Sequence, residues 1–184
     1  MTDNQTEIAS AESALGRRIA IDAIRFERTF AAPPARLWAA LTTPEGLEPW
    51  LGSATLELRT GGVYRVRLNE EVEMVGRIVT LEPPAKLVLA WHEIEGGVAT
   101  AHATTDDDES ELSFELQPEG NGTRLVLVHR LIRAGEAMIG FGAGWHALLE
   151  ALRASLAGAP AIDVARTYAS LQPSYLEAFS DEMQ

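Results

Sequence analysis

One stretch constrains the fold more than any other: it runs from Met138 to Gly158 and reads MIGFGAGWHALLEALRASLAG. Its large apolar residues recur at the spacing of an α-helix and therefore share one stripe. The stripe consists of Phe141, Trp145, Leu148, Leu149, Leu152 and Leu156. Gly158 suits a helix C-cap and Pro160 cannot continue a helix, so we expect the helix to end there. Because the chain before it reads mostly as strands, the stripe must be buried against the sheet that they form.

The segments before this helix alternate between apolar and polar residues, which is typical of half-buried β-strands. We expect strands within 19–30, 56–68, 72–82, 86–93, 110–118 and 123–130. The second of these segments contains Gly61-Gly62, a pair suited to a tight hairpin turn, and Glu119 to Gly122 carries another hairpin signal. Pro83-Pro84 ends a strand because neither proline can donate to a ladder. Residues 96–108 read as a long hairpin connection that contains some extended chain.

Two short helices are expected after the first strand. Pro33-Pro34 opens one with the sequence ARLWAAL, and Thr43 is placed to cap a second that begins at Pro44. The fold class is therefore α+β: a curved antiparallel sheet of about six to seven strands, wrapped on one long C-terminal helix. We expect residues 18–158 to form this domain, 1–17 a flexible tail, and 159–184 an extension with a short helix.

Composition and charge exclude several classes of function. Of the 184 residues 46% are hydrophobic, which is enough for one core, and the formal net charge is −12. Such a surface repels nucleic-acid phosphates and anionic lipids, so neither nucleic acid nor membrane is expected as a partner. The chain contains no cysteine, which excludes disulfides and thiol catalysis. With no apolar run long enough to span a bilayer and no secretory signal pattern, we expect a cytoplasmic protein.

Several short motifs recur in a fixed order along the chain. They are Ala32-Pro33-Pro34 with Leu37-Trp38, Thr43-Pro44-Glu45 with Trp50, Arg59-Thr60-Gly61-Gly62, Gly76-Arg77-Ile78 with Pro83-Pro84 and Trp91, Gly122-Thr123-Arg124-Leu125 with His129, and Gly144-Trp145 with Leu149 and Leu152. Together they cover roughly Ile24 to Ala157, most of the chain. In these motifs the sequence resembles the activator of Hsp90 ATPase homologue 1-like (AHSA1-like) branch of the SRPBCC, or START/Bet v 1-like, superfamily. The resemblance implies a helix-grip fold.

The resemblance also implies a cavity between the sheet and the long helix that takes apolar or ring-bearing molecules. Some members of the superfamily are cyclases, dehydratases or hydrolases, and many only bind a ligand. The eukaryotic Hsp90 activators carry an additional N-terminal domain for which this chain has no room. The primary hypothesis is therefore binding of a small apolar or aromatic molecule, and the alternatives are an enzyme acting on such a molecule and a co-chaperone-like interaction module.

Aromatic residues at inward positions of the expected strands and helix are the candidates for the lining of such a cavity. The candidate ligand-binding residues are Trp50, Tyr64, Met74, Trp91, Phe114, His129, Phe141 and Trp145. Met74 would supply an adaptable apolar wall, whereas Trp50 and Phe141 stand near segment ends where a portal would open. The alternative for all of the aromatic residues is that they only fill the core.

His129 is the one candidate for catalysis, because it ends an inward-facing alternation and would place an imidazole in the cavity. The alternative is a core-edge histidine that hydrogen-bonds to the backbone or to a neighbouring side chain. No carboxylate stands at a useful spacing to form an acid/base pair with it, which favours binding over catalysis. His129 and Tyr64 would then give the ligand its polar contacts.

Other patterns do not support a cofactor or a metal. Gly140, Gly142 and Gly144 have the wrong spacing for a dinucleotide fingerprint, and we expect them to loosen the start of the long helix. The acidic run 104–111 lacks the glycine and glutamate of a calcium loop, and the four histidines show no ligand spacing. At the C-terminus, Tyr175, Leu176 and Phe179 present an apolar face that could cover the domain itself, cap the cavity or form a homodimer.

Overall fold

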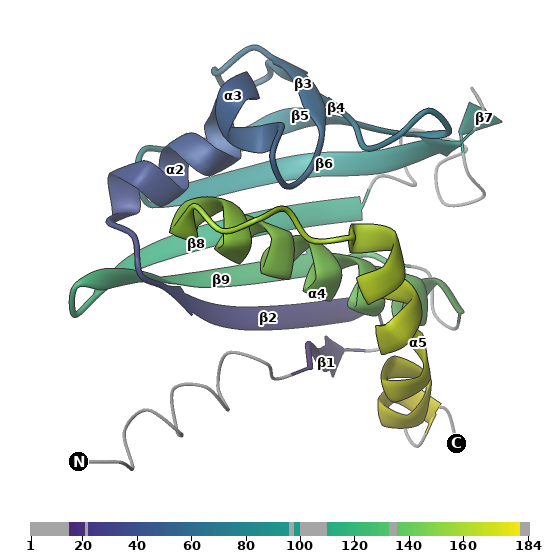
Figure 1. Ribbon diagram of the computed structural model, residues 1–184. Coiled ribbons are helices and arrows are strands. Elements are labelled where there is room, and N and C mark those ends of the chain that lie inside the picture. Colours follow the sequence, from purple (N-terminus) through teal and green to yellow (C-terminus); the bar gives the residue numbers. More distant parts are fainter. Residues whose placement is uncertain (1–14, 21, 96–97, 100–109, 133–135, 181–184) are drawn as a thin grey trace, which may run out of the picture.

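The computed structural model describes residues 15–20, 22–95, 98–99, 110–132 and 136–180. One curved antiparallel sheet wraps around the long helix α4, with α2 and α3 above it in the view of Figure 1. The strands are β1 (Arg17–Ala20), β2 (Ala23–Phe30), β3 (Ser53–Leu56), β4 (Val63–Arg67), β5 (Val72–Glu82), β6 (Lys86–Glu95), β7 (Val98–Ala99), β8 (Ser110–Glu119) and β9 (Gly122–Arg130). The helices are α2 (Pro34–Thr42), α3 (Pro44–Leu47), α4 (Glu136–Ala157) and α5 (Val164–Ser180). This arrangement confirms the predicted helix-grip architecture.

The sheet has the strand order β1-β2-β9-β8-β6-β5-β4-β3, with β7 paired to β6. Within the described residues the sheet has nine strands, more than the six to seven expected from the sequence. One reason is that the segment predicted as the first strand forms both β1 and β2, which pair with each other. The second is the two-residue β7, which lies in the region predicted as a hairpin connection. The rest of that region falls outside the described residues.

The Gly61-Gly62 pair does not form the tight hairpin turn that the sequence predicts. β3 ends at Leu56 and β4 begins at Val63, so six residues separate the two strands. The backbone N–H of Gly61 donates to the carbonyl of Ile78, and the N–H of Ile78 donates to the carbonyl of Gly62, at 2.7 and 2.9 Å. The glycines thus pair with β5 and lengthen the turn. Of the two, only Gly61 has a positive φ, at 77°.

The alternation predicted for the strands places the core on the concave face of the sheet. Leu87, Leu89 and Trp91 of β6 are buried, as are Leu112, Phe114 and Leu116 of β8 and Leu125, Leu127 and His129 of β9. The predicted helix starts also hold. The side chain of Thr43 accepts a hydrogen bond from the N–H of Gly46, which caps α3 with Pro44 in its first turn.

The glycines of the G-x-G-x-G stretch lie inside α4 and do not precede it, so the prediction of a loosened helix start is wrong. The helix begins at Glu136, and only one of the three glycines, Gly142, is required for close packing. A Cβ at Gly142 would come within 2.6 Å of the Tyr175 ring, whereas one at Gly144 would meet nothing within 4 Å. Gly142 therefore lets α5 approach α4 closely.

Helix α5 crosses the start of α4 at a steep angle, as the yellow ribbon of Figure 1 shows, and packs against it. Tyr175 and Phe179 are buried and their rings lie 5.4 Å apart, while Leu176 is 53% exposed. Of the three arrangements considered for this apolar face, the structure shows packing on the chain's own domain for two of its three residues.

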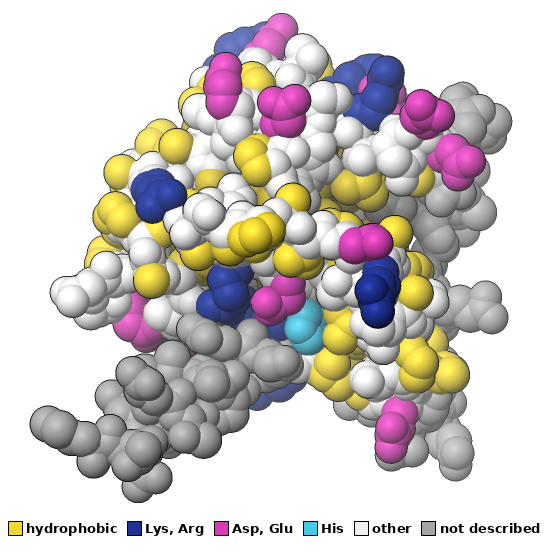
Figure 2. Space-filling model, viewed as in Figure 1, with side chains coloured by type: hydrophobic (Ala, Val, Ile, Leu, Met, Phe, Trp, Pro, Cys, Tyr) yellow, Lys and Arg dark blue, Asp and Glu magenta, His cyan; other side chains and the backbone are white. Residues whose placement is uncertain are grey.

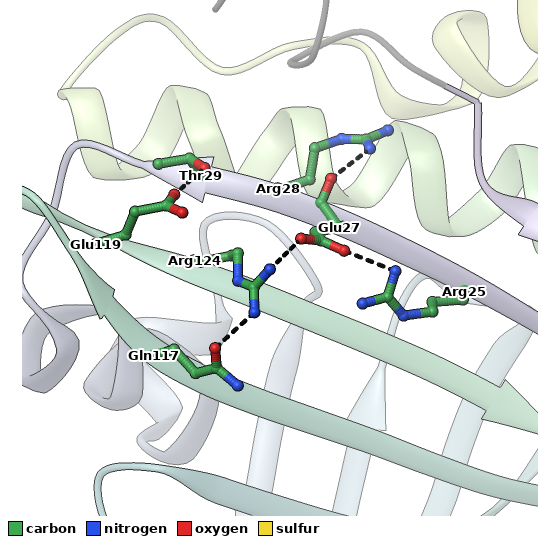
Figure 3. Close-up of polar contacts among 7 residues, drawn as sticks. All are labelled: Arg25, Glu27, Arg28, Thr29, Gln117, Glu119 and Arg124. Carbon is green, nitrogen blue, oxygen red and sulfur yellow. Dashed lines mark hydrogen bonds and ion pairs between the residues drawn. The ribbon is translucent and has the colours of Figure 1, made fainter.

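The outer face of the sheet carries a row of polar contacts across β2, β9 and β8 (Figure 3). Glu27 pairs with Arg25 and Arg124 at 2.6 Å each, and Arg124 also donates to Gln117. Burial raises the pKa of the Glu27 carboxyl, but the hydrogen bonds and charges of Arg25 and Arg124 outweigh this effect. They hold the pKa of Glu27 below its usual range. Arg28 points the opposite way, toward α4.

Candidate functional site

Aromatic side chains from both layers of the fold converge between the sheet and α4. Tyr64 of β4, Trp91 of β6 and Phe114 of β8 come from the sheet, and Trp145 comes from the helix. The ring of Trp91 lies 6.1 Å from that of Tyr64 and 6.3 Å from that of Trp145. The rings of Phe114 and Trp145 meet edge to face at 6.1 Å. These four rings, with His129 and Phe141, are called the aromatic cluster below.

A glycine in the middle of β5 allows the sheet's rings to meet. Gly76 is paired with Tyr64 on one side and with Trp91 on the other. A Cβ at this position would lie 2.5 Å from the carbonyl oxygen of Ala90 and 3.3 Å from the Trp91 ring. Sequence reasoning did not identify Gly76 as part of the site. An isolated glycine inside a strand pattern often marks such a close approach and could have signalled it.

His129 lies at the end of the cluster and is fully buried. The indole Nε1–H of Trp145 donates to His129 Nδ1 at 3.1 Å, and the histidine Nε2 lies 2.7 Å from the hydroxyl oxygen of Ser110. That hydroxyl donates to the carbonyl of Trp91 at 2.8 Å. Because an indole N–H can only donate, Nδ1 must be the acceptor, and the proton of the neutral ring is on Nε2.

These hydrogen bonds determine what the imidazole can do. Burial lowers the pKa of His129 to about 3, so the ring is neutral at physiological pH. Both of its nitrogens are engaged, and no carboxylate contacts it among the described residues. This is the arrangement of the core histidine that the sequence left as the alternative to an acid/base. Ser110, at the start of β8, is a member of the network that sequence reasoning missed.

Phe141, on α4, is the half-buried member at the edge of the cluster. Its ring meets the imidazole of His129 edge to face, with the centroids 4.6 Å apart. It is the only member of the cluster that is not fully buried. The structure therefore brings together six of the eight candidate residues: Tyr64, Trp91, Phe114, His129, Phe141 and Trp145.

Two further candidates have other surroundings. Trp50 is buried and its Nε1–H donates to the carbonyl of Ala40 at 2.9 Å, which ties the chain after α3 to α2. Met74 is buried two residues from Gly76 and on the same face of β5. The hydroxyl of Tyr64, which the sequence offered as a polar contact for a ligand, donates to the carbonyl of Leu41 at 2.7 Å. Burial raises the pKa of this phenol well above its usual value.

A second polar group lies where α4 and α5 meet β2. The hydroxyl of Tyr175 accepts from the N–H of Gly16 at 2.7 Å and lies 3.2 Å from His146 Nδ1. Burial and the nearby charge of Arg28 lower the pKa of His146 to about 4. Figure 2 shows a histidine side chain on this face, with an acidic side chain on one side of it and hydrophobic side chains on the other. These contacts join the N-terminal segment to the C-terminal helix.

Metal ligands do not gather anywhere in the part of the chain that the structure describes: no group of three or more histidine, aspartate or glutamate side chains could hold an ion there. Within the same residues, no helix has the length and apolarity needed to cross a membrane.

The family model that matches the chain is that of activator of Hsp90 ATPase homolog 1-like proteins, over residues 31–157. That match spans more than half of the sequence. The chain belongs to the AHSA1-like family. The matched residues of this family include the whole aromatic cluster, whereas β1, β2 and α5 lie outside them. Among curated proteins, no sequence matches this AHSA1-like chain.

Solved structures with the same fold support this assignment. CalU16 from Micromonospora echinospora is 27% identical, with a TM-score of 0.67 over 91% of this chain and 96% of CalU16. The protein encoded by gene BPP1335 of Bordetella parapertussis is 26% identical, with a TM-score of 0.68 over 89% and 92% of the two chains. DynU16, from the dynemicin biosynthetic locus, shares the fold at 22% identity and a TM-score of 0.64, over 76% of this chain and 49% of DynU16. The AHSA1-like chain is thus similar to these proteins along most of its length.

Proposed function

We propose that this protein binds a small apolar or aromatic molecule between the curved sheet and α4. The observation that carries the proposal is the convergence of five aromatic rings from three strands and one helix on a single interior region. Tilted and edge-to-face rings of this kind favour a flat, ring-bearing partner over an aliphatic one.

Binding is a better proposal than catalysis because of the state of His129. A general acid or base must hold or release a proton at an atom within reach of the substrate. Here one ring nitrogen accepts from Trp145 and the other is bonded to Ser110, while burial keeps the ring uncharged. Such a histidine fixes the position of Trp145 in the cluster. We therefore propose His129 as a positioning residue of a binding site.

Thermal unfolding of the purified protein with a panel of aromatic and aliphatic small molecules tests the proposal. A ligand that binds only the folded state raises the free energy of unfolding by about 2.7 kcal/mol at a hundredfold excess over its Kd. We expect this rise for aromatic compounds, together with a change in tryptophan fluorescence from Trp91 and Trp145.

Two variants provide a matched comparison. Phe114→Leu removes a ring of the cluster, and Phe30→Leu removes an equally buried ring of β2 that lies outside the cluster. Both should lower the melting temperature of the free protein, but only Phe114→Leu should reduce the shift that a ligand causes. If no compound of any class stabilises the wild-type protein, or if both variants respond to ligand alike, the proposed binding region is wrong.

A further inference from the structure

The buried polar atoms of the aromatic cluster are paired with one exception. The Tyr64 hydroxyl donates to the carbonyl of Leu41, and the Trp145 Nε1–H donates to His129. His129 uses its second nitrogen for Ser110. The indole Nε1 of Trp91, by contrast, has no hydrogen-bond partner among the described residues, although only 1% of Trp91 is exposed.

An unpaired buried donor is costly, because the folded protein loses the hydrogen bond that water would otherwise provide. Native proteins leave few such groups unpaired, and those that remain call for a specific explanation. The position of this one is informative. The indole of Trp91 lies between Tyr64 and Trp145, in the middle of the region where the proposed ligand would bind.

We infer that the ligand of this site carries a neutral carbonyl oxygen on an apolar ring system, and that this oxygen accepts a hydrogen bond from Trp91 Nε1. The inference rests on the proposed function and specifies its ligand class as cyclic aromatic ketones or quinones. The rings of the cluster would bind the body of the molecule, and Trp91 would select its polar end.

The chemistry of the donor limits the polar groups that a ligand could place against it. An indole N–H only donates, so it cannot pair with a ligand ammonium group, which also only donates. The aromatic cluster contains no lysine or arginine, so a carboxylate or phosphate would be buried there without a counter-charge. A carbonyl oxygen only accepts, and it therefore matches a single unpaired donor with no further polar group required.

Matched pairs of probes that differ only in the carbonyl test this inference: 1-tetralone with tetralin, 9-fluorenone with fluorene, and anthrone with 9,10-dihydroanthracene. We expect each ketone to bind the wild-type protein about tenfold more tightly than its hydrocarbon, which is the usual effect of one neutral hydrogen bond. In a ¹⁵N-labelled sample, the indole Nε1–H signal of Trp91 should move downfield with the ketone and not with the hydrocarbon.

Trp91→Phe removes the donor and keeps an aromatic ring, and Trp38→Phe is the control because Trp38 lies on α2 outside the cluster. The preference for the ketone should disappear in Trp91→Phe and persist in Trp38→Phe. Should Trp91→Phe not fold, the indole signal of the wild-type protein still decides the question. Equal binding of both members of every pair, with the Trp91 indole signal unmoved, would overturn the carbonyl inference and leave the proposed function standing. Binding of no member of any pair would overturn both.

Discussion

The buried imidazole of His129 predicts how the stability of this protein depends on pH. Its pKa is about 3 in the folded protein because burial disfavours the charged form, against an ordinary value of 6.5 in the unfolded chain. Below pH 6.5 the unfolded state therefore binds a proton at this ring that the folded state does not bind. The free energy of unfolding should therefore show no loss from this ring above about pH 6.5, and it should fall as the pH decreases from there toward 3.

The magnitude follows from the two pKa values. Between pH 7 and pH 5 the protonated fraction of His129 in the unfolded chain rises from about a quarter to almost one, which lowers the free energy of unfolding by about 2 kcal/mol. His146 adds a loss in the same direction, because burial and the charge of Arg28 also lower its pKa, to about 4. Carboxylates titrate in the same range, so the contribution of His129 has to be isolated by substitution.

Urea unfolding of the wild-type protein and of His129→Asn at pH 7 and pH 5 isolates it. The variant should be less stable than the wild type at pH 7. On going from pH 7 to pH 5, however, its free energy of unfolding should fall by about 2 kcal/mol less than that of the wild type. Leu127→Ala, at the preceding inward position of β9, removes a buried side chain without removing a titratable group and should keep the wild-type loss. An equal loss in the wild type and in His129→Asn would show that His129 is not held neutral in the core, and the reasoning about its hydrogen bonds would fail with it.

Two further predictions concern the contact between α4 and α5. Gly142→Ala should lower stability by about 1 to 3 kcal/mol in thermal unfolding, because the new Cβ would press on the Tyr175 ring. Gly144→Ala, where a Cβ meets nothing, should raise stability by about 0.5 to 1 kcal/mol, and destabilisation by both would contradict this packing. Tyr175→Phe should cost about 1 to 3 kcal/mol, because the N–H of Gly16 and Nδ1 of His146 lose their shared partner. Hydrogen exchange at the Gly16 amide should accelerate in that variant, and unchanged exchange would refute the link.

The period of apolar residues predicted the architecture because it depends only on local geometry. A spacing of two residues in β6 and β9 places Trp91 and His129 on the inward face, and the helical stripe of α4 does the same for Trp145. The cap of α3 was predictable for a similar reason, since Thr43 reaches a backbone N–H only three residues away. Errors arose where distant backbone decided the local structure, as at Gly61 and Gly62, which pair with β5.

Sequence periodicity by itself determined which face each side chain of the cluster occupies, but only the tertiary structure decided its partner. His129 and Trp145 are 16 residues apart and on different elements, and their hydrogen bond fixes the tautomer of the ring. Trp91 illustrates the same division. Its inward position follows from the alternation along β6. That its N–H has no partner among the described residues depends on how all the neighbouring strands and helices pack around it. The physical reason is that a face is set by the backbone within one element, whereas hydrogen bonds and ring contacts depend on how separate elements pack together.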